Sequence, residues 1–304
     1  MGFVDLDGAK IHFEECGSGP AVLFVHGWGA SWRFFATAMR RLAPARRCIA
    51  IDWKGMGDSD KPVADYRMED YADEVRKVAD RLGLQRFVLV GHSMGGMVSA
   101  LFATLHPERL LGVGLINAPV RGPTAFSRRT KLLVLPVIRW IAWLGSRIPW
   151  VRRMASGDFT YRTRLEDWVF DDFAKGTYCA LFRSIGRIAE LDLTERLASI
   201  RVPALVIYSD HDRIIRSDQF ALACERIPGA RPVLLSPVGH CPMLEEPERC
   251  GAALQAFLDE VQPVPASTSA APASVALPAL ASGSADSAPA CAVPAIPATS
   301  GWGS

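Results

Sequence analysis

The residue best suited to nucleophilic chemistry is a serine framed by glycines. Residues Gly91 to Gly95 form a G-x-S-x-G pattern with Ser93 at its centre. A dense apolar run, 87–90, precedes the pattern, and a helix-like apolar run, 96–105, follows it. A tight turn from a strand to a helix lifts a serine oxygen clear of a sheet, and only small neighbours fit around it. The pattern in this setting predicts that Ser93 is a nucleophile.

A serine hydroxyl needs a base, and a histidine late in the chain supplies a candidate. His240 lies in the segment GHCPMLEEPE, just after the last expected strand, so we expect it on a loop at the carboxyl edge of a sheet. A carboxylate must then hold the histidine in one tautomer and stabilise the imidazolium that forms as Ser93 loses its proton. Asp210 and Asp212 both follow the expected strand 205–208, and both are candidates for this acid.

The elements that must position these residues alternate along most of the chain. Short runs of β-branched and aliphatic residues are each followed by a longer helix-like segment, which predicts an α/β protein with parallel strands and helical crossovers. Apolar spacing of three and four predicts helices over 71–82 and 250–261. Near the N-terminus, an Asp7-Gly8 turn signal predicts a hairpin at the sheet edge. The expected parallel strands are 21–25, 48–51, 87–90, 110–116, 205–208 and 233–235.

Two segments depart from this alternation. Between Asn117 and about Leu193 the pattern becomes helical and rich in Arg and Trp. We therefore expect a helical cap over 119–191, inserted into a core formed by residues 1–118 and 192–261. Residues 262–304 are mostly Ala, Pro and Ser, a composition that cannot bury enough apolar surface to offset its ordering entropy, so we expect a disordered tail.

Several motifs together resemble the α/β-hydrolase superfamily over about residues 3–261. They are the order Ser, Asp, His and the segments HGWGAS, DWKGMGDSD, GHSMGG and GHCPMLEEPE. The resemblance implies a mostly parallel twisted sheet flanked by helices, with a capped, serine-esterase-like site. It also favours Asp212 as the acid, because relatives carry it at the fourth place of the turn that here begins at Ser209, and leaves Asp210 as the fallback. Some relatives place the acid after the preceding strand, where Asn117 cannot carry the charge.

The same resemblance implies an oxyanion hole made of two backbone amides. They belong to Met94, after the nucleophile, and Trp28, after the His-Gly pair. Fixed N–H donors of this kind stabilise the charge that develops on an attacked carbonyl. We expect the side chain of Trp28 to narrow the acyl side of a substrate pocket, with His92 beside it, although a histidine in that position more often packs or forms hydrogen bonds.

The apolar stretch 131–154 is the main indication of the substrate. It contains Trp140 and Trp143 and is flanked by arginines. We interpret it as a lid that lines a hydrophobic acyl pocket or transiently touches a lipid surface, although ordinary packing of the cap on the core explains most of its apolar character.

These features predict a cofactor-free serine hydrolase that cleaves the carboxylic ester of a hydrophobic or medium-sized acyl group through an acyl-enzyme. Carbon-carbon bond hydrolases, lactonases and cofactor-free haloperoxidases share the elbow, and a non-catalytic hydrolase-like ligand receptor remains open. Epoxide hydrolases and dehalogenases are disfavoured because those relatives use Asp where this chain has Ser93.

Composition limits the remaining function classes. The 34 Lys and Arg against 32 Asp and Glu leave a net charge of +2, which gives no general attraction for nucleic acid. Seven cysteines without C-x-x-C spacing suggest neither a disulfide framework nor a zinc site. The first residues lack the features of a signal peptide, and the longest apolar stretch, 132–144, is shorter than the ~20 residues of a bilayer span, so we expect a cytoplasmic protein.

Other titratable residues have structural interpretations. His12 is expected on a strand, and His26 is expected to shape the turn beneath the oxyanion loop. The DWKGMGDSD run suits a tight turn from a strand to a helix, so we do not expect Asp52 to be the catalytic acid.

Overall fold

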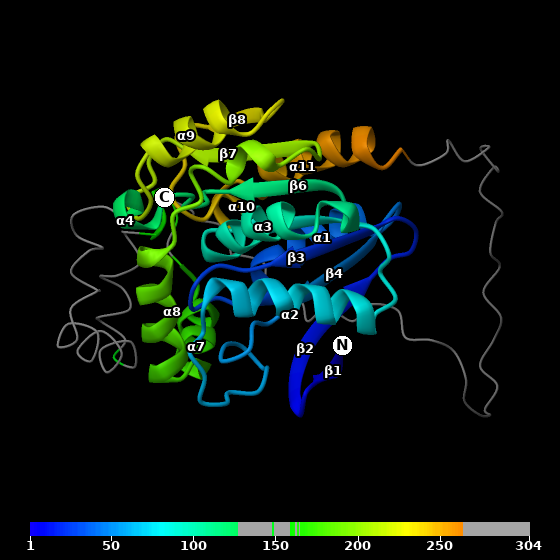
Figure 1. The fold of residues 1–304 in the computed structure, drawn as a ribbon, viewed down its shortest axis with the longest axis vertical. Coiled ribbons are helices and arrows are strands. Elements are labelled where there is room, and N and C mark those ends of the chain that lie inside the picture. Colours follow the sequence, from blue (N-terminus) through cyan, green and yellow to red (C-terminus); the bar gives the residue numbers. More distant parts are fainter. Residues whose placement is uncertain (127–147, 149–158, 162, 164, 264–304) are drawn as a thin grey trace, which may run out of the picture.

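The computed structural model describes residues 1–126, 148, 159–161, 163 and 165–263 (Figure 1). Within them, eight strands form one sheet in the order β1-β2-β4-β3-β5-β6-β7-β8. The pairs β1–β2 and β2–β4 are antiparallel, and all others are parallel. The predicted α/β class and edge hairpin are therefore confirmed. The strands are β1 (Gly2–Leu6), β2 (Ala9–Cys16), β3 (Ala21–Val25), β4 (Arg47–Ile51), β5 (Phe87–His92), β6 (Leu110–Ile116), β7 (Ala204–Ser209) and β8 (Arg231–Leu235).

Helices cover both faces of this sheet. Alternate residues of β3 enter two separate hydrophobic cores, since side chains of a strand point to opposite faces. Leu23 packs in the core beneath α2 and α3, whereas Phe24 packs in the core beneath α1 and α11. The described helices of the sheet region are η1 (Trp32–Phe35), α1 (Ala36–Leu42), α2 (Met68–Arg81), α3 (Met94–Leu105), η2 (Pro107–Arg109), η4 (Leu197–Ser199), α9 (Asp218–Arg226), α10 (Pro242–Glu245) and α11 (Pro247–Val261).

Three further helices belong to the segment that the sequence assigns to a cap, residues 119–191. They are α4 (Gly122–Ala125), α7 (Asp167–Lys175) and α8 (Tyr178–Glu190). In Figure 1, α7 and α8 stand beside the edge to which β6 points, where the parallel strands end. A helical cap over 119–191 remains our proposal. Trp140 and Trp143 lie outside the described residues.

The described chain ends just beyond α11. Gln262, which the sequence assigns to the tail, is buried, and its side-chain amide donates a hydrogen bond to the carbonyl oxygen of Ala21 at 2.8 Å. The rest of the predicted tail, 264–304, lies outside the described residues. Among the helices that the structure describes, none combines the length and the apolar character needed to cross a membrane.

Candidate active site

Ser93 occupies a sharp turn between β5 and α3. Its backbone has φ 52° and ψ −119°, a region that residues other than glycine rarely adopt. The neighbouring glycines are required by close backbone approaches. A Cβ atom at Gly91 would lie 2.1 Å from the carbonyl oxygen of Gly95, and one at Gly95 would lie 2.3 Å from that of Val25. The G-x-S-x-G pattern therefore makes the strand-to-helix turn that its spacing predicts.

The structure brings Ser93, His240 and Asp212 together from three separate parts of the chain. His240 Nε2 lies 3.0 Å from Ser93 Oγ, and His240 Nδ1 lies 2.7 Å from Asp212 Oδ2. A carboxylate only accepts hydrogen bonds, so Nδ1 carries the proton and Nε2 offers its lone pair to the serine hydroxyl. The Asp212 side chain is fully buried, and its Oδ1 accepts the amides of Ile214 and Ile215 at 2.8 and 2.9 Å.

Asp210, the alternative acid, points elsewhere. Its carboxylate contacts His211 and accepts hydrogen bonds from the Ser236 hydroxyl and the Val238 amide. Partial burial favours a higher pKa for Asp210, but the contacts with His211, Ser236 and Val238 outweigh it and lower the pKa to about 2. Asp210 therefore braces the loop after β8, whereas Asp212 faces the histidine.

The loop after β3 lies directly against Ser93. A Cβ atom at Gly27 would sit 3.1 Å from the Cβ of Ser93 and 2.9 Å from His92 Nδ1. Trp28 is the next residue along this loop. Met94 is the first residue of α3, where an amide has no carbonyl partner within its own helix. The two amides that the sequence assigns to the oxyanion hole thus belong to segments flanking Ser93.

The Trp28 side chain faces α7 and α8. Its indole Nε1 donates to the carbonyl oxygen of Leu181 at 2.5 Å, and its ring lies edge-on to Phe173 and Phe182 at 5.3 and 6.2 Å between centroids. That the Trp28 side chain also lines a substrate pocket remains a proposal.

His92 connects the turn at Ser93 to the loop that carries His240. Its Nε2 donates to the carbonyl oxygen of His240 at 2.8 Å, and its ring stacks on Phe34. Its Nδ1 has no hydrogen-bond partner among the described residues. Burial, reinforced by the nearby His240, holds the pKa of His92 well below its usual value, so the ring is neutral.

Asn117 is an anchor that the sequence analysis missed. It follows β6 with φ 45°, and its amide nitrogen donates to Ser209 Oγ at 3.0 Å and to the carbonyl oxygen of His240 at 2.9 Å. Its Oδ1 accepts the Ser209 amide at 2.9 Å. The sequence signal was a polar residue at the end of a buried apolar strand, which we considered only as an unsuitable acid.

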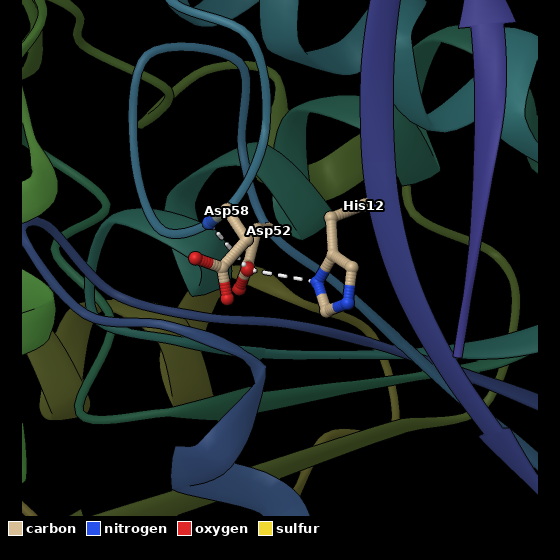
Figure 2. Close-up of side chains that lie close together, drawn as sticks. All are labelled: His12, Asp52 and Asp58. Atoms are coloured by element: carbon tan, nitrogen blue, oxygen red, sulfur yellow. Dashed lines mark hydrogen bonds and ion pairs between the residues drawn. The ribbon is translucent and has the colours of Figure 1, made fainter.

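A second cluster joins the buried His12 and Asp52 with the exposed Asp58, and Figure 2 shows Asp52 between the other two. Atoms of these side chains that can bind metals lie within 4.8 Å of one another. However, the Asp52 carboxylate already contacts His12 Nδ1 and accepts the amides of Trp32 and Asp58. Lys175 pairs with Asp58 at 2.9 Å. Because N–H donors occupy Asp52, the cluster fits a structural network better than a metal site, in line with the interpretation of the DWKGMGDSD run.

Comparisons with known proteins agree with this fold. A sequence model of the alpha/beta hydrolase family matches residues 22–253. The bifunctional epoxide hydrolase 2 of Rattus norvegicus is 38% identical over 119 residues, which are 38% of this chain and 22% of that protein. The pimeloyl-(acyl-carrier protein) methyl ester esterase of Aeromonas hydrophila is 25% identical over 262 residues, 79% of this chain and 96% of that protein. A solved structure described as a membrane phospholipase A, a bacterial virulence factor, is 27% identical with a TM-score of 0.77 and covers 86% of each chain. The family match spans most of the sequence, and the chain therefore belongs to the α/β-hydrolase family.

Proposed function

We propose that this protein is a serine hydrolase that cleaves the carboxylic ester of a hydrophobic or medium-sized acyl group. The observation that carries the proposal is the continuous hydrogen-bond chain from Ser93 through His240 to the buried Asp212. Such a chain activates a serine hydroxyl at neutral pH, because the base and the group that orients it are already in place.

The proposed reaction has two halves. In the first, Ser93 Oγ attacks the ester carbonyl while His240 Nε2 takes the hydroxyl proton, and the amides of Trp28 and Met94 hold the oxyanion. The intermediate expels the alcohol, which receives the proton from His240, and an acyl-enzyme remains. In the second, a water molecule attacks the carbonyl carbon of the acyl-enzyme while His240 takes its proton. The bond to Ser93 Oγ then breaks, the carboxylic acid leaves, and His240 returns the proton to Ser93. Every proton moves between these groups, so the reaction needs no cofactor.

The choice of an ester is supported by the similar proteins. One is named as a methyl ester esterase and another as a phospholipase. The match to the epoxide hydrolase covers a minor part of that protein, and this chain has Ser93 at the elbow. The apolar composition of 131–154 within the proposed cap supports a hydrophobic acyl group.

A panel of p-nitrophenyl esters from acetate to palmitate tests the proposal, with the Ser93→Ala variant as control. We expect nitrophenol release that is lost in the variant, and covalent labelling of Ser93 by a fluorophosphonate probe. No release above the variant would refute the esterase. Labelling without ester cleavage would instead favour a carbon-carbon bond hydrolase, a lactonase or a haloperoxidase, and failure of both would favour a ligand receptor.

A further inference from the structure

The loop that follows β3 contacts α7 and α8, the two longest described helices of the proposed cap. This oxyanion loop, residues 26–31, runs from the end of β3 to η1. At Gly29, with φ 66°, the loop approaches α7 so closely that a Cβ atom would lie 2.4 Å from the ring of Phe173. Helices α7 and α8, which come far later in the chain, thus pack against the segment that supplies a proposed oxyanion donor.

One connection is made through α8. The carbonyl oxygen of Leu181 accepts the indole proton of Trp28 at 2.5 Å. The Trp28 backbone carries the proposed oxyanion amide, so the side chain of the same residue fixes that amide relative to the cap.

The second connection is made through α7. Asp172 is only 1% exposed, and its Oδ2 accepts the hydroxyl proton of Ser31 at 2.6 Å. Arg33 and Lys175 lie 3.7 and 3.1 Å from the other oxygen. These two ion pairs offset part of the cost of burying the carboxylate, although Oδ1 has no hydrogen-bond partner among the described residues. Ser31 also accepts the Arg33 amide at 3.3 Å and caps η1, so the bond from Asp172 reaches the backbone at the end of the oxyanion loop.

We infer that Asp172 is a positioning residue for the oxyanion hole, acting from the cap through Ser31. The inference rests on the proposed function. Donors stabilise a developing oxyanion only when they are held in place before the reaction, and small displacements remove much of their effect. The position of the Trp28 amide therefore depends on the packing of α7 and α8 against the loop, and Asp172 supplies the hydrogen-bond acceptor of that contact.

The test compares Asp172→Ala, Asp172→Asn, Ser31→Ala and the double variant Ser31→Ala/Asp172→Ala. Asp171→Asn, an exposed neighbour on the same helix, is the matched control. The measurements are kcat and KM for the best ester of the panel, and the inhibition constant of a trifluoromethyl ketone with the same acyl chain. This ketone forms a tetrahedral adduct with Ser93 whose oxygen occupies the oxyanion hole, so its affinity reports the hole directly.

We expect Asp172→Ala to lower kcat and weaken the ketone by the same factor, about 10- to 100-fold, with KM changed less than about threefold. This is part of the ~10²- to 10³-fold effect of losing one donor entirely. Asp172→Asn should recover most of the loss, since its amide oxygen still accepts the Ser31 proton. Ser31→Ala should lose about as much as Asp172→Ala, and the double variant should lose no more than either.

The inference is overturned if folded Asp172→Ala binds the ketone within twofold of wild type, or if the two single losses multiply in the double variant. A rise in KM at constant kcat would also overturn it, because that pattern indicates substrate binding instead. Should Asp172→Ala not fold, Ser31→Ala carries the same comparison against wild type, and Asp172→Asn is then expected to stay close to wild type. The rate of amide hydrogen exchange in peptides covering 26–35 reports, without any substrate, how firmly the oxyanion loop is held against α7 and α8. If Ser31→Ala leaves this exchange unchanged, the contact between the loop and the cap is refuted even when wild type cleaves no ester. If wild type is inactive on esters, only the proposed function is refuted.

Discussion

Replacing Glu74 by glutamine should stabilise the protein above neutral pH. Glu74 lies on α2 and is only 3% exposed. Its Oε1 accepts the Lys54 amide at 2.9 Å, but its Oε2 has no hydrogen-bond partner among the described residues. Burial in these surroundings raises the pKa of the carboxyl from 4.5 to about 7. Between pH 4.5 and about 7, the native protein therefore keeps a proton on Glu74 that the unfolded chain has already released.

The sign follows from proton binding. Between pH 4.5 and 7 the native state binds more protons at Glu74 than the unfolded state, so the free energy of unfolding falls as pH rises through this window. Above the native pKa, Glu74 is ionised in both states, and the free energy of unfolding no longer falls on its account. A raised pKa of 2.5 units, from 4.5 to 7, corresponds to about 3 kcal/mol at 1.36 kcal/mol for each unit.

Glu74→Gln keeps the size and the acceptor for Lys54 but cannot ionise. We expect its free energy of unfolding to match wild type near pH 4.5 within ~1 kcal/mol, and to exceed wild type by about 3 kcal/mol at pH 8. Urea unfolding at pH 5, 6, 7 and 8 measures the difference. Glu69→Gln, on an exposed position of the same helix, is the control and should show little pH-dependent change. A difference between Glu74→Gln and wild type that grows by less than ~1 kcal/mol from pH 5 to pH 8 refutes the reasoning.

Three further predictions concern the candidate site. Asp212→Asn should lower kcat by ~10⁴-fold, because His240 is no longer held in the tautomer that accepts the serine proton. Asp210→Asn should lower kcat by less than about tenfold. Steady-state kinetics measures both, and a larger loss in the Asp210 variant would assign the acid to Asp210. Gly27→Ala places a methyl group 3.1 Å from the Cβ of Ser93 and should lower kcat more than about tenfold in a folded protein, so a kcat equal to wild type would contradict the close approach. Asn117→Ala removes an amide that joins β6, β7 and the loop of the base, and should lower the free energy of unfolding by about 2 kcal/mol; an unchanged urea midpoint would show that the anchor is dispensable.

The central sheet could be predicted because its strands are buried on both faces. β3 and β6 have the predicted bounds, since continuous apolar runs end where the strands end. At the edge the agreement is weaker. β8 begins at Arg231, two residues before its apolar run, because the register with β7 and not the residue types extends it. The meeting of Ser93 and His240 followed from the rule that parallel strands end at one edge of a sheet.

The contacts that surround the site could not be predicted in the same way. The direction of the Trp28 indole depends on where α8 lies, and no periodicity encodes that position. The Ser31–Asp172 bond joins residues 141 positions apart, and the motif HGWGAS, which ends at Ser31, does not specify a partner for that serine. Asn117 forms its four side-chain hydrogen bonds from a backbone with positive φ at the end of β6, a conformation that the sequence does not specify.

The order of strands in the sheet has a consequence for how the protein is made. A ribosome synthesises the N-terminal residues first, and strands β1 to β6 with the complete elbow precede β7 and β8, which occupy the far edge of the sheet. The proposed acid, Asp212, follows β7, and the proposed base, His240, follows β8. A nascent chain that ends before β7 therefore contains Ser93 but neither Asp212 nor His240, so under the proposed mechanism its serine has no base until the last two strands have been made.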